Sequence, residues 1–295
     1  MFELIQYNIA PWGPEIAIFF FLIGMAAMTF VYAAAPAVFG DIFGGIARSM
    51  EPFQRVGLLV SMILLLICTG LLILDLGMPE RFFYPILYFH WTSPVSWGTA
   101  FLPLFGLCIV GFFFALQTKR EGWLKPIGVL GMLLALSMPL YTGLDLMVHQ
   151  TRELWSNSTI PVLFVILSVS SGTAVVAVIQ LARKQFDEKT AEFLHWFLFV
   201  SVATTFALFL GQWVTFMFGT EELQQAWVII NEQYWFQFWV LTFLVGILVP
   251  LVMMAIPRCC RSAPMITLAA VLSAVGAFSF RAVLIYAGQL TQIYF

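Results

Sequence analysis

Charged side chains are scarce in this sequence. Asp, Glu, Lys and Arg make up 9% of its 295 residues, whereas soluble globular proteins carry about 25%. Hydrophobic residues reach 62%, and the mean hydropathy is +0.97. This composition excludes a soluble globular protein and predicts an integral membrane protein. The net charge of -2 provides no broad basic surface, so we expect membrane lipids, and no nucleic acid, among its partners.

Residues that bind haem and metals are equally few. The three histidines do not supply a pair of facing helical ligands for haem. Cys68 and Cys108 lie in apolar runs, and the other two cysteines are adjacent at 259 and 260, which is not the spacing of an iron–sulfur or zinc site. We therefore expect no haem, metal or iron–sulfur cluster in this chain. Any electron chemistry must then use a diffusible carrier or a cofactor of a partner.

Long apolar runs, in contrast, fill most of the chain. A helix of about 20 residues crosses a hydrocarbon core about 30 Å thick, and eight runs have this length. No stretch between them is long enough for a soluble domain, so we expect any catalytic domain to belong to another chain. The sequence predicts a single all-α membrane domain over residues 1–295, with transmembrane helices near 14–38, 53–74, 95–117, 124–147, 160–183, 191–218, 235–256 and 263–287.

The distribution of Lys and Arg predicts the orientation of these helices. Short cytoplasmic loops carry an excess of both residues. Of the 13 basic residues, 10 lie in or beside the connections that follow the first, third, fifth and seventh runs. The opposite side holds only Arg81 and Arg152, while Arg281 lies inside the eighth run. We therefore predict that both termini lie outside the cytoplasm, on the periplasmic side of a bacterial inner membrane.

Ionisable residues within or next to the runs gather near the outer ends of the first, second, fourth and eighth runs. A charge inside a transmembrane segment costs roughly 2.5–3.5 kcal/mol on insertion scales, so a layer of them predicts a shared functional pocket. The residues also leave open that Asp75 with Arg81, and Asp145 with Arg152, form interfacial salt bridges that fix loops. The layer contains Glu15, Asp75, Arg81, Tyr141, Asp145, His149, Arg152 and Arg281.

A lipid-soluble quinone is the carrier that such a pocket suits. Each quinone carbonyl needs a hydrogen-bond donor, for which Tyr141 is the best-placed candidate, and two-electron transfer requires two protons. We expect Arg81 or Arg281 to keep a neighbouring carboxylate ionised. The candidates for proton transfer are three carboxylates: Glu15, Asp75 and Asp145.

Five motifs together are similar to those of a known family. They are DLGMPERFF at 75–83, SPVSWG at 93–98, YTG at 141–143, LWSNSTIPVLF at 154–164 and RAVLIYAGQ at 281–289. In this order the chain resembles, over about residues 10–290, the membrane subunits of the NrfD and polysulfide reductase family. The resemblance implies an eight-helix, haem-free subunit made of two four-helix bundles. It also implies a quinone, either menaquinone or ubiquinone, and a docked four-cluster ferredoxin-like iron–sulfur subunit that connects to a molybdopterin catalytic chain or to multihaem cytochromes.

The family pattern can be carried to individual positions of this sequence. It implies that Tyr141 contacts the quinone headgroup, and that Arg81 and Trp97 belong to the site, although Trp97 equally suits an interfacial aromatic belt. His90 is either a proton donor at the mouth of the pocket or a loop residue that faces solvent. Glu15 departs from the family, some members of which offer Asn or His from the first helix. The remaining matching positions are Asp75, Pro79, Ser93 and Gly143.

The sequence therefore predicts a quinone-binding membrane anchor that passes electrons between the quinone pool and an iron–sulfur subunit docked on the periplasmic face. A secondary transporter with a polar gate at the outer face is the alternative. A third possibility is a subunit that also moves protons, for which Thr69, Thr205 and Gln212 offer stepping points without forming a charged chain.

Overall fold

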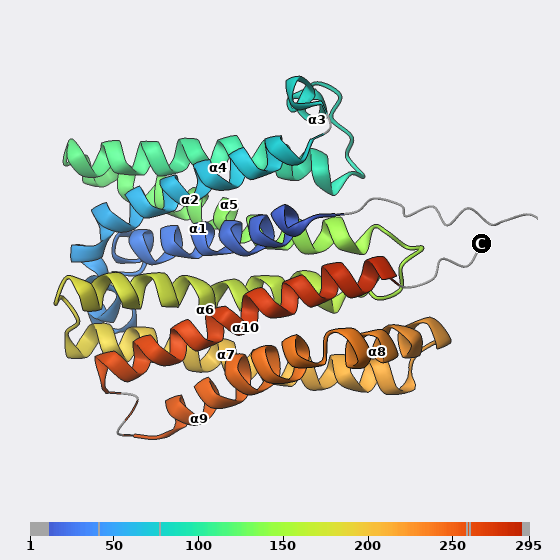
Figure 1. Ribbon diagram of the computed structural model, residues 1–295. Coiled ribbons are helices and arrows are strands. Elements are labelled where there is room, and N and C mark those ends of the chain that lie inside the picture. Colours follow the sequence, from blue (N-terminus) through green and yellow to red (C-terminus); the bar gives the residue numbers. More distant parts are fainter. Residues whose placement is uncertain (1–11, 41, 77, 258, 260, 291–295) are drawn as a thin grey trace, which may run out of the picture.

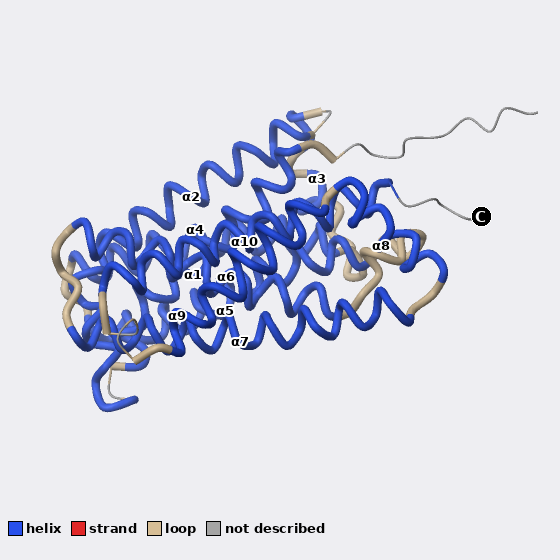
Figure 2. Tube along the Cα trace, turned by 60° about the horizontal axis from the view of Figure 1, so that its bottom comes forward, coloured by secondary structure: helices blue, strands red, loops and turns tan. Residues whose placement is uncertain are grey.

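A computed structural model describes residues 12–40, 42–76, 78–257, 259 and 261–290. These residues form helices and connecting turns, with no strand among them (Figures 1 and 2). In chain order the helices are α1 (Pro14–Phe39), the 3-10 helix η1 (Phe43–Phe53), α2 (Gln54–Asp75), the 3-10 turn η2 (Pro79–Arg81), α3 (Tyr84–Leu87), α4 (Pro94–Gln117), α5 (Glu121–Met147), α6 (Thr159–Ala182), α7 (Glu188–Phe218), α8 (Glu221–Gln233), the π-helix η3 (Phe236–Leu248), α9 (Val249–Ala255) and α10 (Ala263–Leu290).

Eight helical stretches of the described chain are long and apolar enough to cross a membrane, which is the number that the sequence predicts. The second of them joins η1 to α2, and the seventh joins η3 to α9. The start of α1 and the end of α10 lie at the same end of the bundle, together with α3 and α8 (Figure 1). We call this the outer end. The predicted positions of the two chain termini concern residues 1–11 and 291–295, which lie outside the described residues.

The interior of the bundle is built around α1. This helix packs against α2, α5, α6 and α10. In its most apolar stretch of 18 residues, 72% of the residues are buried. On one side of it α4 packs on α5, and on the other side α10 packs on α6 and η3 (Figure 1). The faces of α2, α4 and α5 that point away from the interior expose aliphatic side chains such as Leu66, Leu107 and Leu133, as expected for surfaces that face lipid.

The seventh span differs from the regular α-helix that its sequence predicts, because its first part is π-helical. A π-helix is wider than an α-helix and alters the pattern of backbone hydrogen bonds. Two hydroxyl groups compensate at this point: Thr242 and Ser279 both donate to the carbonyl oxygen of Gln237, at 2.9 and 2.8 Å. Ser279 belongs to α10, so this bond also ties the irregular helix to its neighbour.

The close approach of α5 to α6 leads to a first prediction. A Cβ atom placed on Gly143 of α5 would lie 2.4 Å from the Cα of Pro161 in α6, and backbone cannot move aside as a flexible side chain can. We expect Gly143→Ala to destabilise the protein by about 1–3 kcal/mol, the usual cost of overpacking. Thermal unfolding in detergent measures it.

Gly70→Ala is the matched control, because, apart from the backbone of its own helix, no heavy atom of the described chain lies within 4 Å of its Cβ position. Gly70 lies inside α2, where Ala is favoured over Gly by roughly 0.5–1 kcal/mol. We expect this variant to unfold at the wild-type temperature or above it. Equal unfolding temperatures for Gly143→Ala and the wild type would show that α5 and α6 can move apart to fit the added methyl group without loss of stability.

Candidate functional site

Tyr141 lies near the outer end of α5 with its ring pressed against α4. A Cβ atom on Gly98 would lie 2.3 Å from a carbon of this ring, so only glycine leaves room for the ring in this position. The side chain is 7% exposed. Its hydroxyl group makes no hydrogen bond to another residue of the described chain. The ring is thus fixed by packing, and its hydroxyl is a donor that the described chain leaves unused.

Asp145 lies one helical turn beyond Tyr141, on the same face of α5. The two side chains are close enough for the carboxylate to act electrostatically on the phenol. His149 follows after another turn, with Nδ1 2.8 Å from the backbone oxygen of Asp145. The order Tyr141, Asp145, His149 therefore places a hydrogen-bond donor, a carboxylate and an imidazole along one line toward the outer end of α5.

Asp75 and Glu15 lie at the outer end of the bundle on two other helices. Asp75 is the last residue of α2 and Glu15 lies in the first turn of α1, and the two charges are near enough to repel. Both side chains are exposed. Arg81 forms no ion pair with Asp75 within the described residues, and its guanidinium instead lies 5.8 Å from the ring centre of Tyr84. The structure thus brings the three predicted carboxylates to the outer end but leaves Arg81 apart from them.

Arg281 lies deep in the bundle, away from this group. It is fully buried, and its guanidinium donates to the carbonyl oxygens of Ala277 and Phe164 and to the hydroxyl of Ser168, at 3.1, 2.9 and 2.9 Å. These partners are all neutral, and its Nε atom has no partner among the described residues. The expectation that Arg281 holds a carboxylate ionised does not fit these contacts. Its observed role is to join α10 to α6.

Trp97 directly precedes Gly98 in α4, and His90 lies seven positions earlier, in the connection before this helix. The indole nitrogen of Trp97 donates to the backbone oxygen of Trp91 at 2.9 Å, and its ring lies 5.3 Å from that of Phe101. His90 is exposed, and its backbone N–H donates to the hydroxyl of Ser96. The imidazole of His90 therefore faces solvent in the described part of the chain and does not line a pocket.

A cluster that the sequence did not reveal closes the outer end between α1 and α10. The Trp12 backbone donates to the side-chain oxygen of Gln289 at 2.9 Å, and the Gln289 side-chain nitrogen donates to the Trp12 carbonyl at 3.1 Å. The rings of Trp12 and Trp155 stack at 5.1 Å, and His149 meets both edge to face. These partners are up to 277 residues apart, so no local pattern predicts them.

Arg152 adds to this closure from the connection between α5 and α6. Its guanidinium donates to the carbonyl oxygen of Gly288 and lies 5.0 Å from the ring centre of Trp155. Burial lowers the pKa of Arg152, although a guanidinium stays charged at neutral pH. The outer end of α10 is therefore held by a buried cation as well as by stacked rings.

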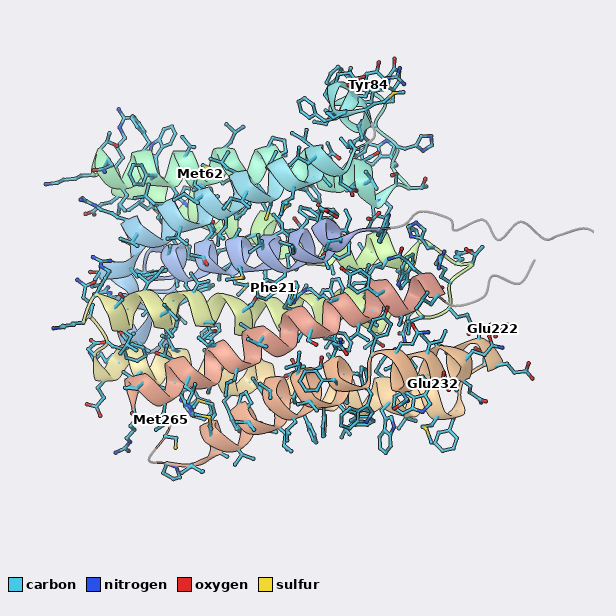
Figure 3. All side chains as sticks on the ribbon, in the orientation of Figure 1. Phe21, Met62, Tyr84, Glu222, Glu232 and Met265 are labelled. Carbon is cyan, nitrogen blue, oxygen red and sulfur yellow. The ribbon has the colours of Figure 1, made fainter. Side chains whose placement is uncertain are left out.

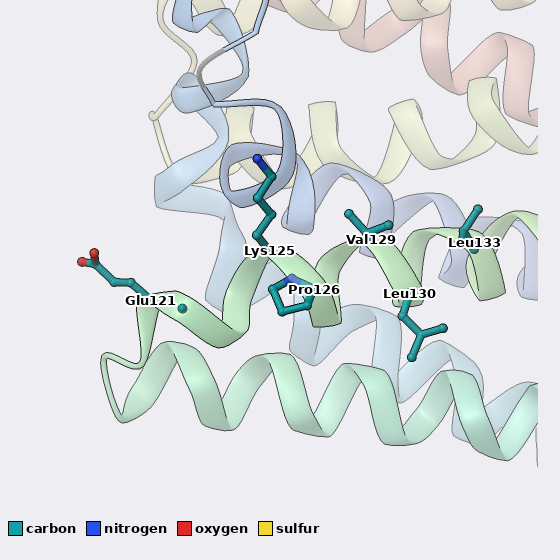
Figure 4. Close-up of a pocket in the computed structure, with 7 residues that line it drawn as sticks. Glu121, Lys125, Pro126, Val129, Leu130 and Leu133 are labelled. Carbon is teal, nitrogen blue, oxygen red and sulfur yellow. The ribbon is translucent and has the colours of Figure 1, made fainter.

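A broad hollow of the surface lies at the other end of the bundle. It is a shallow groove of about 790 Å³ along the start of α5, and Figure 4 shows the side chains around it. Apart from Glu121 and Lys125 its lining is apolar, and no residue of the Tyr141 site belongs to it. Among the described residues there is also no group of three or more His, Cys, Asp or Glu side chains able to hold a metal ion. The groove is therefore separate from the residues around Tyr141.

Comparison with known proteins agrees with this picture of a membrane subunit. The sequence profile of the family described as polysulphide reductase, NrfD matches residues 3–293. Protein NrfD of Escherichia coli is 25% identical, over 95% of each sequence, and a polysulfide reductase chain of Wolinella succinogenes is 23% identical, over 96% of each. The Hdr-like menaquinol oxidoreductase integral membrane subunit of Archaeoglobus fulgidus is 23% identical, over 96% of this protein and 72% of the relative. The chain belongs to the polysulphide reductase NrfD family.

Proposed function

We propose that this chain is the quinone-binding membrane anchor of an oxidoreductase complex. It exchanges electrons between menaquinone or ubiquinone in the membrane and a docked four-cluster ferredoxin-like iron–sulfur subunit, which in turn serves a molybdopterin catalytic subunit or a multihaem cytochrome. The observation that supports this function best is the Tyr141 hydroxyl, which has no hydrogen-bond partner in the described chain although its ring is buried. A quinone carbonyl is an acceptor that this donor fits.

The quinone supplies the two-electron chemistry, and the residues of this chain supply binding and protons. Tyr141 donates a hydrogen bond that fixes the headgroup next to α4. Asp145 lies one turn away and accepts or returns protons, and Asp75 and Glu15 continue this path to the outer end, since positioned carboxylates act as general acids and bases. Trp97 shapes the rim of the site, while Arg81 and His90 stand outside it. Arg281 supports the helices on which the site depends.

The orientation and grouping of the helices belong to the same proposal. The outer end faces the periplasm of a bacterial inner membrane, because 10 of the 13 basic residues gather at the opposite end. The eight spans form a single membrane domain of two four-helix bundles, one with α1, α2, α4 and α5 and the other with the remaining spans. A transporter is less well supported, since transporter sites lie near the bilayer midplane, whereas Asp75 ends α2 and Tyr141 lies in the outer part of α5.

The test is reduction of the iron–sulfur partner by added quinol in the purified complex. We expect the wild type to carry out this reaction, and Asp75→Asn to slow it by at least about tenfold, because loss of a proton-transferring group typically costs 10²–10⁴-fold and Asp145 retains part of the path. Glu80→Gln is the control, since this exposed carboxylate lies five positions beyond Asp75 and outside the proposed site.

Two outcomes would contradict different parts of the proposal. A wild-type complex that is assembled but does not accept electrons from any quinol would refute the quinone function. Equal rates for Asp75→Asn, Glu80→Gln and the wild type would leave the quinone function intact and remove Asp75 from the proton path.

A further inference from the structure

The segment from Pro79 to Trp91, which we call the outer arm, exposes far more apolar surface than a connection of its length requires. Leu87, Tyr88 and Trp91 are 65%, 74% and 75% exposed. Contiguous apolar patches larger than a few hundred Å² are rare on soluble monomers and mark interaction sites. The other large apolar side chains exposed on the arm are Phe82, Phe83, Tyr84 and Ile86.

The aromatic rings of the arm pack mainly on one another. Phe82 meets Phe83, Phe83 meets Tyr84, and Tyr84 meets Tyr88, with ring centres 5.2–5.8 Å apart. Within the described chain, α3 packs only against α4 to any extent. The arm is therefore a small unit with its own aromatic contacts, whose outward face is not packed against any other part of the described chain.

The position of the arm determines what covers that face. It is tied at both ends to membrane spans, since α2 ends at Asp75 and α4 begins at Pro94. Figure 1 shows that α3 stands to the side of the bundle, away from α10, rather than beyond the tips of the helices. Tyr84, labelled in Figure 3, marks this lateral position. A segment held beside the bundle at the level where two spans end is in a position to contact the surrounding lipid.

The composition of the arm and its continuity with lipid-facing surfaces agree with this placement. Its exposed side chains continue the exposed aliphatic faces of α2 and α4, which include Leu74 and Leu104. Trp and Tyr are enriched at the membrane–water interface, where an apolar ring and a polar tip are both satisfied. Arg81 can reach a phosphate group while its aliphatic stem stays among the rings.

We propose that the outer arm is a membrane-interface anchor, with its apolar face inserted among glycerophospholipid headgroups and the upper acyl chains of the outer leaflet. The arm thereby fixes the ends of α2 and α4 at a defined depth. This inference does not depend on quinone chemistry. It concerns lipid, and it excludes a soluble partner protein as the occupant of this face.

Site-directed spin labelling of the complete complex in phosphatidylcholine liposomes tests the proposal. Nitroxide labels are attached to Leu87→Cys and Tyr88→Cys in a background in which Cys259 and Cys260 are replaced by Ser, while Cys68 and Cys108 are buried and stay. Leu107→Cys on the exposed face of α4 is the hydrocarbon reference, and Glu222→Cys at the start of α8 is the aqueous reference (Figure 3). Power saturation then compares collisions with oxygen and with a water-soluble nickel chelate.

We expect the ratio of oxygen to nickel collisions at positions 87 and 88 to be several-fold above that at position 222 and below that at position 107. A ratio equal to that at position 222 would place the arm in water and overturn the proposal. Low collision rates with both reagents would show that protein covers the arm, which would overturn it as well. Positions 87, 88 and 107 are exposed and position 222 is half-buried, so labelling leaves the core unchanged, and electron transfer by each labelled complex confirms assembly.

Discussion

Tyr141→Phe is expected to slow quinol-dependent reduction of the iron–sulfur partner by about 100-fold while the complex still assembles. The variant removes one oxygen atom, and with it the hydrogen bond that positions the quinone and the nearest donor for its carbonyl. Because this hydroxyl makes no hydrogen bond to another described residue, its removal leaves no protein group unpaired. We therefore expect a thermal unfolding temperature equal to that of the wild type. Stopped-flow reduction and thermal unfolding measure the two quantities.

Tyr32→Phe is the matched control, because Tyr32 is also a buried tyrosine. Its hydroxyl lies 2.6 Å from that of Thr173, which ties α1 to α6. Losing this hydrogen bond should cost about 1 kcal/mol of stability and leave the electron-transfer rate unchanged. The two variants thus have opposite expected signatures. If the Tyr141→Phe complex transfers electrons at the wild-type rate, the Tyr141 hydroxyl has no part in the reaction and the residue serves packing only.

The number of spans could be predicted from the sequence because the signal is strong and local. Each apolar run of about 20 residues has few alternatives to a membrane-spanning helix. The short helices α3 and α8 were not predicted. α3 is only four residues long, too short to show a helical period, whereas α8 was missed although its buried residues Leu223, Ala226 and Ile230 recur at helical spacing. The π-helix η3 was also missed, because it depends on hydroxyls such as Ser279 that reach Gln237 from a different helix.

The candidate site, like the fold, could be predicted from the sequence only in part. Residues that share a helix, such as Tyr141 and Asp145, could be placed together from their spacing alone. The position of Arg281 could not, because depth along a helix does not say which neighbour the side chain faces, and its contacts with Phe164 and Ser168 join segments more than 110 residues apart. From the sequence, Gly98 could be singled out only as the last residue of the SPVSWG motif. Its contact with Tyr141 is a property of how α4 crosses α5.

Gly98→Ala is expected to slow electron transfer by roughly 10- to 100-fold, although Gly98 contributes no functional group. The added Cβ would lie 2.3 Å from the Tyr141 ring, whereas carbon atoms in contact prefer about 3.5–4.0 Å. The ring must therefore move by about 1 Å, a displacement that can cost about 100-fold where a reacting group is positioned. Gly98 is a positioning residue in this interpretation. Gly106→Ala on the same helix is the control, since its Cβ would lie 3.4 Å from a flexible Leu65 methyl group.

A double-mutant cycle separates positioning from a general effect on the fold. If Gly98 acts through the Tyr141 hydroxyl, Gly98→Ala should change the rate little in a Tyr141→Phe background, where that hydroxyl is already absent. If the substitution instead distorts α4 and α5 as a whole, the two losses should multiply, and the unfolding temperature should fall in both backgrounds. The first result would assign the close contact of α4 and α5 to placing one hydroxyl group. The second would assign it to packing, and the site would then depend on Tyr141 without depending on Gly98.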